Sequence, residues 1–490
     1  NDIMSSKQLL YLLIFMFFLL GCTPDPQPGR TSLPFFFSKA EELIGERRYG
    51  EALIILEEGA QTHPETVEPL ILMGQIYLQQ HRWLLAEDAF NRALARDLTQ
   101  ASATAGLAEA VLNQGRLDEA LKFWQRAITL NPQLPDAHTG LGRTYLSLSD
   151  FEMAKTAFAD QQTHQFSIEA AWYLAALTAP TDLATARSHL GDAEAALADE
   201  AQVSSQAETL RIRNDYLKTT LEPFTIDSSR LDVAHSTGVA FAQIEQWPLA
   251  INALSAAQAQ AESVSIEPEQ RAEILSFLGH ALAQAQKPAL DLFEQARILD
   301  PTSELPLYFE GLYLRQQGAL NAAEALFIQA TQLNPDNAAI YIELGRTKLQ
   351  QGNLGEAEFW YQTGLEVSGN DLSFQVLLLQ FYAGRGYQME TVGIPLAQEI
   401  IETEPNLAQV YDLLGWMYYL SGEPKQAEEQ LQQALVIAPE LVSARYHLAR
   451  YLENQGQTTL ASAEYQRVVD WDQSGVFRDE ALRKLQEISE

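Results

Sequence analysis

The chain has 490 residues, of which 47% are hydrophobic and 20% are charged, a balance that favours a folded chain over a disordered one. Its 65 acidic and 32 basic residues give a formal net charge of −33, and such a surface repels phosphate backbones, so we expect no nucleic-acid partner. The single cysteine excludes an intramolecular disulfide and a cysteine-based metal site.

The first element is an apolar run, LLYLLIFMFFLL, from Leu9 to Leu20. A membrane-spanning helix needs about 20 apolar residues, so this run is short for a permanent anchor. It has the length of the apolar region of a signal peptide, and Lys7 supplies a positive charge ahead of it. We therefore predict a signal peptide at 1–21, with Met4 as the expected start.

The apolar run ends in Leu19-Leu20-Gly21-Cys22, which resembles the bacterial lipobox. The resemblance implies cleavage before Cys22 and diacylation of its thiol; Leu20 departs from the usual small residue. It also implies an extracytoplasmic location in a bacterial cell envelope, with the chain lipid-anchored to a membrane and facing the periplasm or the cell surface. The alternative is an ordinary signal, or an uncleaved anchor, with an inert Cys22.

Three prolines among residues 23–29 prevent regular structure after Cys22, so 22–32 is predicted to be a lipidated cysteine followed by a proline-rich tether.

From residue 33 onward the apolar residues recur at two spacings, the short spacing of a helix face and the longer spacing of a repeated unit. Within 101–134, one apolar face predicts a first helix, a polar turn follows, and a second face ends at Pro132. The first face consists of Thr104, Leu107, Ala108 and Val111, and the second of Ala120, Trp124 and Ala127.

The same unit recurs with a spacing of about 34 residues. Small residues recur where two antiparallel helices must approach closely, and large residues recur where they fill the remaining gaps. One such hairpin cannot bury its apolar faces alone, so neighbouring units must stack. Units with this pattern begin at Val67, Pro135, Glu304, Ala338, Ala408 and Val442.

This pattern resembles the tetratricopeptide repeat over nearly all of 33–490. The resemblance implies an all-α fold: a right-handed superhelical solenoid of about 12 antiparallel helix hairpins with a C-terminal capping helix. We expect an N-terminal array of four repeats at 33–168, a C-terminal array at 231–473 and the capping helix at 474–490. Residues 169–230 fit poorly and are either two degenerate repeats or a non-repeat helical insert, and either could divide the solenoid into two arms.

No motif in the sequence indicates catalysis, so we expect no enzyme activity, no catalytic residue, no cofactor and no metal site. No two histidines have the spacing of a zinc-binding helix, and paired carboxylates are expected in so acidic a chain. The alternative is an enzyme, or an accessory subunit of an envelope enzyme, with its site in 169–230. His189 and Asp192 are the nearest approach to a catalytic pair there.

The family resemblance also implies a concave groove, lined by first-helix positions, that binds a peptide or a protein surface. Aromatic residues and arginine are enriched at binding hot spots, which favours the C-terminal array. The candidate groove residues are Tyr308, Leu312, Arg315, Arg346, Asp412, Trp416, Tyr419, Tyr446 and Arg450. Trp416 or Tyr419 could instead pack against a neighbouring helix. The N-terminal array offers the more polar Glu109, Asn113 and Arg143.

Together these features predict a lipid-anchored scaffold that mediates protein–protein interactions. Family analogy suggests an envelope complex for pilus assembly, polysaccharide export or secretion. Self-association of solenoids, end to end or groove to groove, is a third hypothesis beside the scaffold and the enzyme.

Overall fold

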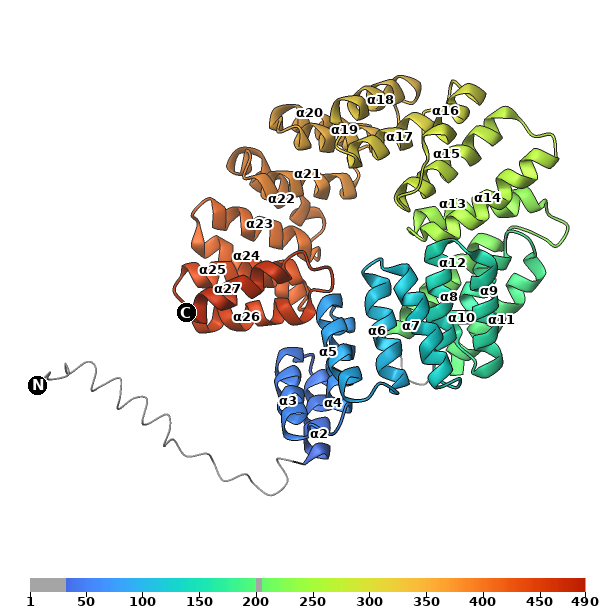
Figure 1. Cartoon of the computed structure of the whole chain (residues 1–490). Coiled ribbons are helices and arrows are strands. Elements are labelled where there is room, and N and C mark those ends of the chain that lie inside the picture. The colour runs from blue at the N-terminus through green and yellow to red at the C-terminus, as the bar shows by residue number, and fades with distance from the viewer. Residues whose placement is uncertain (1–31, 200–204, 490) are drawn as a thin grey trace, which may run out of the picture.

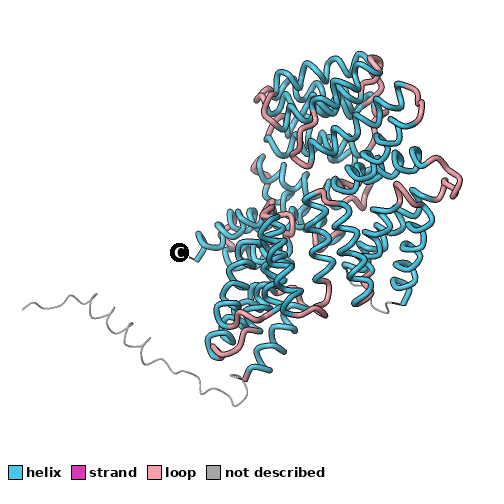
Figure 2. The backbone as a smooth tube through the Cα atoms, turned by 45° about the vertical axis from the view of Figure 1, so that its right-hand side comes forward, coloured by secondary structure: helices cyan, strands magenta, loops and turns pink. Residues whose placement is uncertain are grey.

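The computed structural model describes residues 32–199 and 205–489, and within these ranges it contains helices, turns and loops but no strand (Figure 2). The predicted signal peptide, Cys22 and all but the last residue of the predicted tether lie outside the described residues. Within the described ranges, no helix combines the length and the apolar character that crossing a bilayer requires.

The helices follow one another with short connections along the whole described chain. The first eleven are α2 (Leu33–Gly45), α3 (Tyr49–Thr62), α4 (Glu68–Gln79), α5 (Trp83–Arg96), α6 (Ala101–Asn113), α7 (Leu117–Leu130), α8 (Ala137–Leu148), α9 (Phe151–His164), α10 (Ile168–Thr178), α11 (Leu183–Asp199) and α12 (Ser205–Leu221). The next eight are α13 (Arg230–Gln243), α14 (Trp247–Ser263), α15 (Pro268–Gln284), α16 (Leu290–Leu299), α17 (Leu305–Gln316), α18 (Leu320–Leu333), α19 (Ala338–Gln350) and α20 (Leu354–Val367). The last are α21 (Leu372–Arg385), the π-helical turn η1 (Met389–Gly393), α22 (Ile394–Thr403), α23 (Ala408–Leu420), α24 (Pro424–Ile437), α25 (Val442–Asn454), α26 (Thr458–Trp471) and α27 (Arg478–Ser489).

The 26 α-helices of the described ranges form twelve consecutive hairpins and two single helices, α12 and α27. Each hairpin packs on the next, and first helices of successive hairpins also touch, as α15 touches α17 and α23 touches α25. The predicted fold class, an all-α solenoid of about 12 stacked hairpins, is confirmed. α27 packs on α26 at the end of the stack.

Close approach of the two helices in a hairpin depends on glycines that face an aromatic ring. A Cβ atom added at Gly142 in α8 would lie 2.5 Å from the ring of Phe158 in α9. The same contact recurs at Gly311 in α17, where the added Cβ would lie 2.6 Å from the ring of Phe327. Contacts below about 3 Å do not fit between carbon atoms, so the small residue of the pattern is required by packing.

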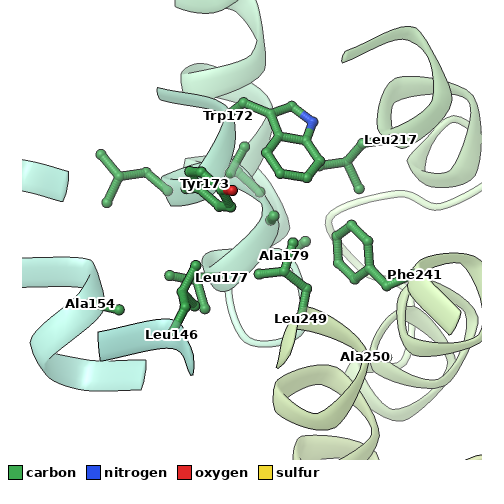
Figure 3. Close-up of a cluster of buried hydrophobic side chains, with 14 of the residues drawn as sticks. Leu146, Ala154, Trp172, Tyr173, Leu177, Ala179, Leu217, Phe241, Leu249 and Ala250 are labelled. Carbon is green, nitrogen blue, oxygen red and sulfur yellow. The ribbon is translucent and has the colours of Figure 1, made fainter. Parts of the chain in front are cut away.

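The segment 169–230 holds one hairpin, α10 with α11, followed by the single helix α12. The largest buried apolar cluster lies here and continues into α13, α14 and α15 (Figure 3). Trp172 and Phe241 are about 1% exposed, and their rings meet edge to face at 6.3 Å. The two halves of the solenoid therefore join through a continuous apolar core. The division of the chain at 169 and 230 stays a prediction.

The solenoid bends so strongly that its two ends meet. In Figure 1 the helices follow a closed curve, and α26 and α27 lie beside α3 and α5. The main-chain N–H of Gly50 in α3 donates to Asp470 Oδ1 in α26 over 3.2 Å, although 420 residues separate them in sequence. The sequence predicted a cap on an open end, whereas the structure places this end against the first repeats.

Candidate functional site

The nine predicted groove residues come from four first helices and form two separate clusters. Tyr308, Leu312 and Arg315 lie on α17, and Arg346 lies on α19. Asp412, Trp416 and Tyr419 lie on α23, whereas Tyr446 and Arg450 lie on α25. The hairpin of α21 and α22 separates the two groups. In Figure 1, α17 and α19 lie on the inner side of the curve, with α18 and α20 outside them.

The first group is built around a buried carboxylate that the sequence did not reveal, and we call it the arginine cluster (Tyr308, Leu312, Arg315, Glu343 and Arg346). Glu343 in α19 is only 5% exposed. Arg346 Nη1 donates to Glu343 Oε1 over 2.6 Å, and Arg315 Nη2 lies 2.8 Å from Glu343 Oε2. Two guanidinium groups on one carboxylate leave a local positive charge in an otherwise acidic chain.

Tyr308 and Leu312 form the apolar side of the arginine cluster. The ring of Tyr308 lies 6.1 Å from that of Phe327 and 5.5 Å from that of Phe309. Burial, followed by the nearby charge of Glu343, raises the pKa of the Tyr308 hydroxyl to about 12. The hydroxyl therefore stays protonated and can donate a hydrogen bond at any physiological pH.

The second group is a stack of rings, which we call the aromatic cluster (Trp416, Tyr419, Tyr446, His447 and Phe477). Trp416 stacks on Tyr419 at 5.0 Å within α23, and on His447 of α25 at 4.3 Å. The ring of Tyr446 lies 5.0 Å from that of Phe477. Trp416 and Tyr419 remain partly exposed, whereas Tyr446 is 7% exposed. Trp416 thus packs on the next repeat and still presents surface to solvent.

A buried ion-pair partner fixes the histidine of the aromatic cluster. His447 Nδ1 lies 2.6 Å from Asp412 Oδ1, and these residues are 8% and 1% exposed. A carboxylate oxygen accepts hydrogen bonds, so this contact requires the hydrogen on the Nδ1 atom of His447. Asp412, a predicted groove residue, is therefore buried against His447 and has almost no exposed surface.

Arg450 lies at the edge of the aromatic cluster. Its Nη1 donates to the hydroxyl of Tyr446 over 3.1 Å and lies 3.6 Å from Glu480 Oε1 in α27. The Arg450 side chain remains 29% exposed, so it can contact a partner that also covers Trp416 and Tyr419. This combination of stacked rings and a tethered arginine is typical of a protein-binding hot spot.

The loop before α27 positions Phe477 through a carboxylate cap. Asp472 accepts hydrogen bonds from the main-chain N–H groups of Gly475, Phe477 and Arg478 over 3.0, 2.7 and 2.9 Å. Burial alone would raise the pKa of Asp472, but these bonds and the one from Ser474 outweigh it and hold the pKa below its usual value. Asp472 therefore stays ionised and holds the loop in one conformation.

Sequence reasoning missed Glu343, His447 and Phe477. Glu343 and His447 each occupy a first-helix position on the edge of the core face, where a polar residue is unexpected and could have been noticed. Phe477 lies within the predicted capping helix at 474–490, whereas in the structure it precedes α27. Its place in the aromatic cluster depends on the Asp472 loop, which no repeat pattern describes.

The polar residues of the N-terminal array also lie together. Arg143 Nη2 donates to Glu109 Oε2 over 2.7 Å, and Arg143 Nε lies 3.8 Å from Glu169 Oε1. A cavity of about 240 Å³ is lined by Glu109 and Arg143 on one side and by Gln246 and Pro248 at the start of α14 on the other. This small polar cavity is a second, weaker candidate for contact with a partner.

The residues of the enzyme alternative do not converge on a site. His189 is partly buried on α11, and Asp192 is exposed one turn later. A cavity of about 570 Å³ lies between α11 and α12, but its lining includes neither residue. Lys218 and Glu194, which do line it, form an ion pair at 2.8 Å. Across the described residues, no three histidine, aspartate or glutamate side chains are placed to hold a metal ion.

The fold defines a helical-repeat protein built of stacked hairpins. The first helices α17, α19, α23 and α25 carry the arginine cluster and, except for Phe477, the aromatic cluster. Comparison with known families identifies the repeats: models of the tetratricopeptide repeat match residues 71–135, 314–378 and 413–475. The chain therefore contains tetratricopeptide repeats, as its sequence pattern predicted.

Two relatives and two solved structures illustrate the likeness. A TPR repeat-containing protein of Methanocaldococcus jannaschii is 22% identical over 463 residues, which cover 92% of this chain and 72% of that protein. The anaphase-promoting complex subunit CDC16 of Saccharomyces cerevisiae is 24% identical over 226 residues, but the match spans only 27% of its length and 44% of this chain. Yeast Tom70 superposes with a TM-score of 0.41 at 12% identity, covering 87% of this chain and 96% of that one. The tetratricopeptide repeat protein of Parabacteroides merdae gives 0.41 at 14% identity, covering 53% and 99%.

Proposed function

We propose that this chain is a scaffold that binds protein partners through the inner faces of its first helices. The observation that carries the proposal is the aromatic cluster, in which Trp416 and Tyr419 are stacked and partly exposed beside the tethered Arg450. Preorganised aromatic side chains lose little conformational entropy on binding, and such residues dominate the affinity of protein interfaces. The arginine cluster extends the same kind of surface onto α17 and α19.

We further propose that the scaffold is held at a membrane of a bacterial envelope by lipid on Cys22. The support is in the sequence: an apolar run of signal-peptide length, a Gly-Cys junction and a proline-rich tether before the first repeat. A lipid anchor followed by a tether would hold the repeats close to a membrane-bound assembly such as a pilus, polysaccharide-export or secretion system.

Crosslinking and capture test the binding face. The full-length protein would be crosslinked in its native host and co-purifying proteins identified by mass spectrometry, in parallel with a Trp416→Ala, Tyr419→Ala variant. We expect specific partners whose recovery falls ~10-fold or more in the variant, because removal of hot-spot rings costs at least one decade of affinity. Phe359→Ala is the matched control, since Phe359 is an aromatic residue 57% exposed on the second helix α20.

Equal loss in both variants would point to general destabilisation, and recovery that neither variant changes would rule out the aromatic cluster as the binding face.

The anchor is tested separately by metabolic labelling with a radioactive fatty acid. We expect labelled wild-type protein in the membrane fraction and no label in Cys22→Ser. Label that persists in the variant would disprove lipidation of Cys22.

A further inference from the structure

The two ends of the solenoid meet along a seam. One side is formed by the α2–α3 loop, α3 and the α4–α5 corner, and the other by the α24–α25 loop, α26 and the start of α27. Three polar contacts cross it. Besides the hydrogen bond from Gly50 N to Asp470 Oδ1, Arg47 Nη1 lies 2.7 Å from Glu440 Oε1, and Arg478 Nη1 donates to the main-chain oxygen of Gln80. The residues that meet are about 400 positions apart, so the seam is a tertiary contact between opposite ends of the chain.

The seam has no apolar core of its own. In the described part of the chain, one buried apolar cluster covers α2 to α8 and another covers α23 to α27, but no cluster contains residues from both ends. The ion pair of Arg47 and Glu440 is exposed, with side chains 46% and 70% accessible. The other two contacts are part-buried, but each is a single hydrogen bond. An exposed ion pair and single hydrogen bonds contribute little individually to the free energy of closure.

The opposite side of the curve is built differently. There the two halves join through the large cluster around Trp172 and Phe241, and Lys287 Nζ of the α15–α16 loop also donates to Ser149 Oγ at the end of α8. Separating the halves at this junction would expose buried aromatic surface, whereas separating the ends at the seam would expose mainly polar groups. The curve is therefore weakest where its ends meet.

We propose that the seam is a reversible latch: the two ends of the solenoid bind each other to close a ring, and the ring opens there without unfolding of any hairpin. Covalent connection gives the ends a high effective concentration, which explains how a few polar contacts hold them together. Opening would expose the inner first-helix faces more widely. That consequence rests on the proposed function, whereas the latch itself does not depend on any partner.

Double electron–electron resonance distances on the full chain test the latch. Cys22→Ser removes the one cysteine, and spin labels at Ile54→Cys in α3 and Leu460→Cys in α26 occupy side chains that are 68% and 55% exposed. The wild-type background should give a main population at one short distance. Gly50→Trp should shift the population to longer distances, because a Cβ at Gly50 already lies 2.8 Å from Gln466 Nε2 across the seam. Arg478→Ala should produce a similar shift.

Two matched controls separate latch opening from damage to the fold. Gly45→Trp adds the same ring where no atom lies within 4 Å, and Arg483→Ala removes an arginine whose partners, Glu480 and Glu487, belong to its own helix. Both should keep the short distance. Circular dichroism must show unchanged helix content in all variants. The latch is refuted if the wild type lacks the short population, or if both seam variants keep it.

Discussion

At the residue scale, the clearest lesson is the reassignment of Asp412. The family pattern gave this position to a partner, but the carboxylate is buried and holds His447 under the ring of Trp416. A buried carboxylate is tolerated only when it is hydrogen-bonded, so Asp412 and His447 are interdependent. Of the groove residues predicted on α23 and α25, Trp416, Tyr419 and Arg450 are therefore the ones that keep exposed surface.

Asp412→Ala should destabilise the C-terminal repeats by roughly 2–4 kcal/mol, because it leaves buried His447 without its partner. Urea denaturation followed by circular dichroism would measure the change. Asp88→Ala removes an exposed carboxylate from α5 and should change stability by less than about 0.5 kcal/mol. An Asp412 variant as stable as the Asp88 variant would contradict the assigned role.

The sequence predicted that the candidate groove residues lie on first helices, where the structure has them, but it did not predict the contacts among these residues. The position of Trp416, Tyr419 and Arg450 within their repeats is enough to predict on which side of the first helix each residue lies. Pairing between repeats, such as Asp412 with His447 or Arg315 with Glu343, depends on the twist between hairpins, which the register does not encode.

At the element scale, the two helices of a hairpin pack closely because an aromatic ring of the second helix lies directly against a glycine of the first. Gly142 faces Phe158 and Gly311 faces Phe327 with the same geometry in different repeats. Glycine weakens a helix by about 1 kcal/mol relative to alanine, so its recurrence inside first helices reflects a packing requirement. This requirement is local, which is why the hairpins could be predicted from sequence.

Gly142→Ala should lower the free energy of unfolding by roughly 1–3 kcal/mol, because the added methyl group would overlap the ring of Phe158. Gly191→Ala in α11 is the informative comparison. Nothing lies within 4 Å of a Cβ at Gly191, so alanine there should stabilise the protein by about 0.4–1 kcal/mol. Thermal unfolding of the two variants would give shifts of opposite sign, and shifts of the same sign would exclude the packing explanation.

The segment 169–230 was harder to predict, because it lacks the regular spacing of small and large residues that identifies a hairpin. Its alanine-rich helices carry their large residues, such as Trp172, out of the repeat register, and the single helix α12 has no hairpin partner. Helical structure was predictable from composition there, whereas the buried stacking around Trp172 arises from neighbours on α13 and α14. The π-helical turn η1 before α22 likewise departs from the repeat, close to Gly386, where a φ of 62° ends α21.

At the scale of the whole molecule, closure into a ring is the feature that the sequence did not indicate. Each repeat specifies only how it packs on its neighbours, and small rotations at each step accumulate into the final curve. Whether the ends miss or meet depends on the sum of these rotations. The seam residues Arg47, Gly50 and Asp470 occupy ordinary surface positions of their repeats, so no local signal marks them.

The seam should respond to pH through Asp470. Burial, with a smaller contribution from the charge of Glu51, raises the pKa of this carboxyl group to about 6, against the lowering effect of the hydrogen bonds from Gln466 and Gly50 and the charge of Arg82. Opening of the ring would expose the carboxyl group to water and lower its pKa, so the closed ring binds the proton more tightly. Closure is therefore favoured as the pH falls through about 6 and is weakened as the pH rises above it.

The short-distance population of the spin-labelled chain should therefore be larger at pH 5 than at pH 7.5. Asp470→Asn keeps the shape of the side chain and removes its titration, so the difference between the two pH values should disappear. A pH response that survives in Asp470→Asn would show that Asp470 is not the group that titrates.

The seam also sets an order of events during synthesis. Every hairpin is complete as soon as its own residues and those of the next repeat have emerged, and such local contacts form rapidly. Gly50 must wait for a partner 420 residues later, and Gln80 for one 398 residues later. During elongation the N-terminal repeats of the nascent chain are therefore folded but have no partner across the seam. The ring can close only after the last repeat has folded. A truncation that removes α26 and α27 would leave most repeats intact yet remove Asp470 and Arg478, and with them two of the three contacts that close the ring.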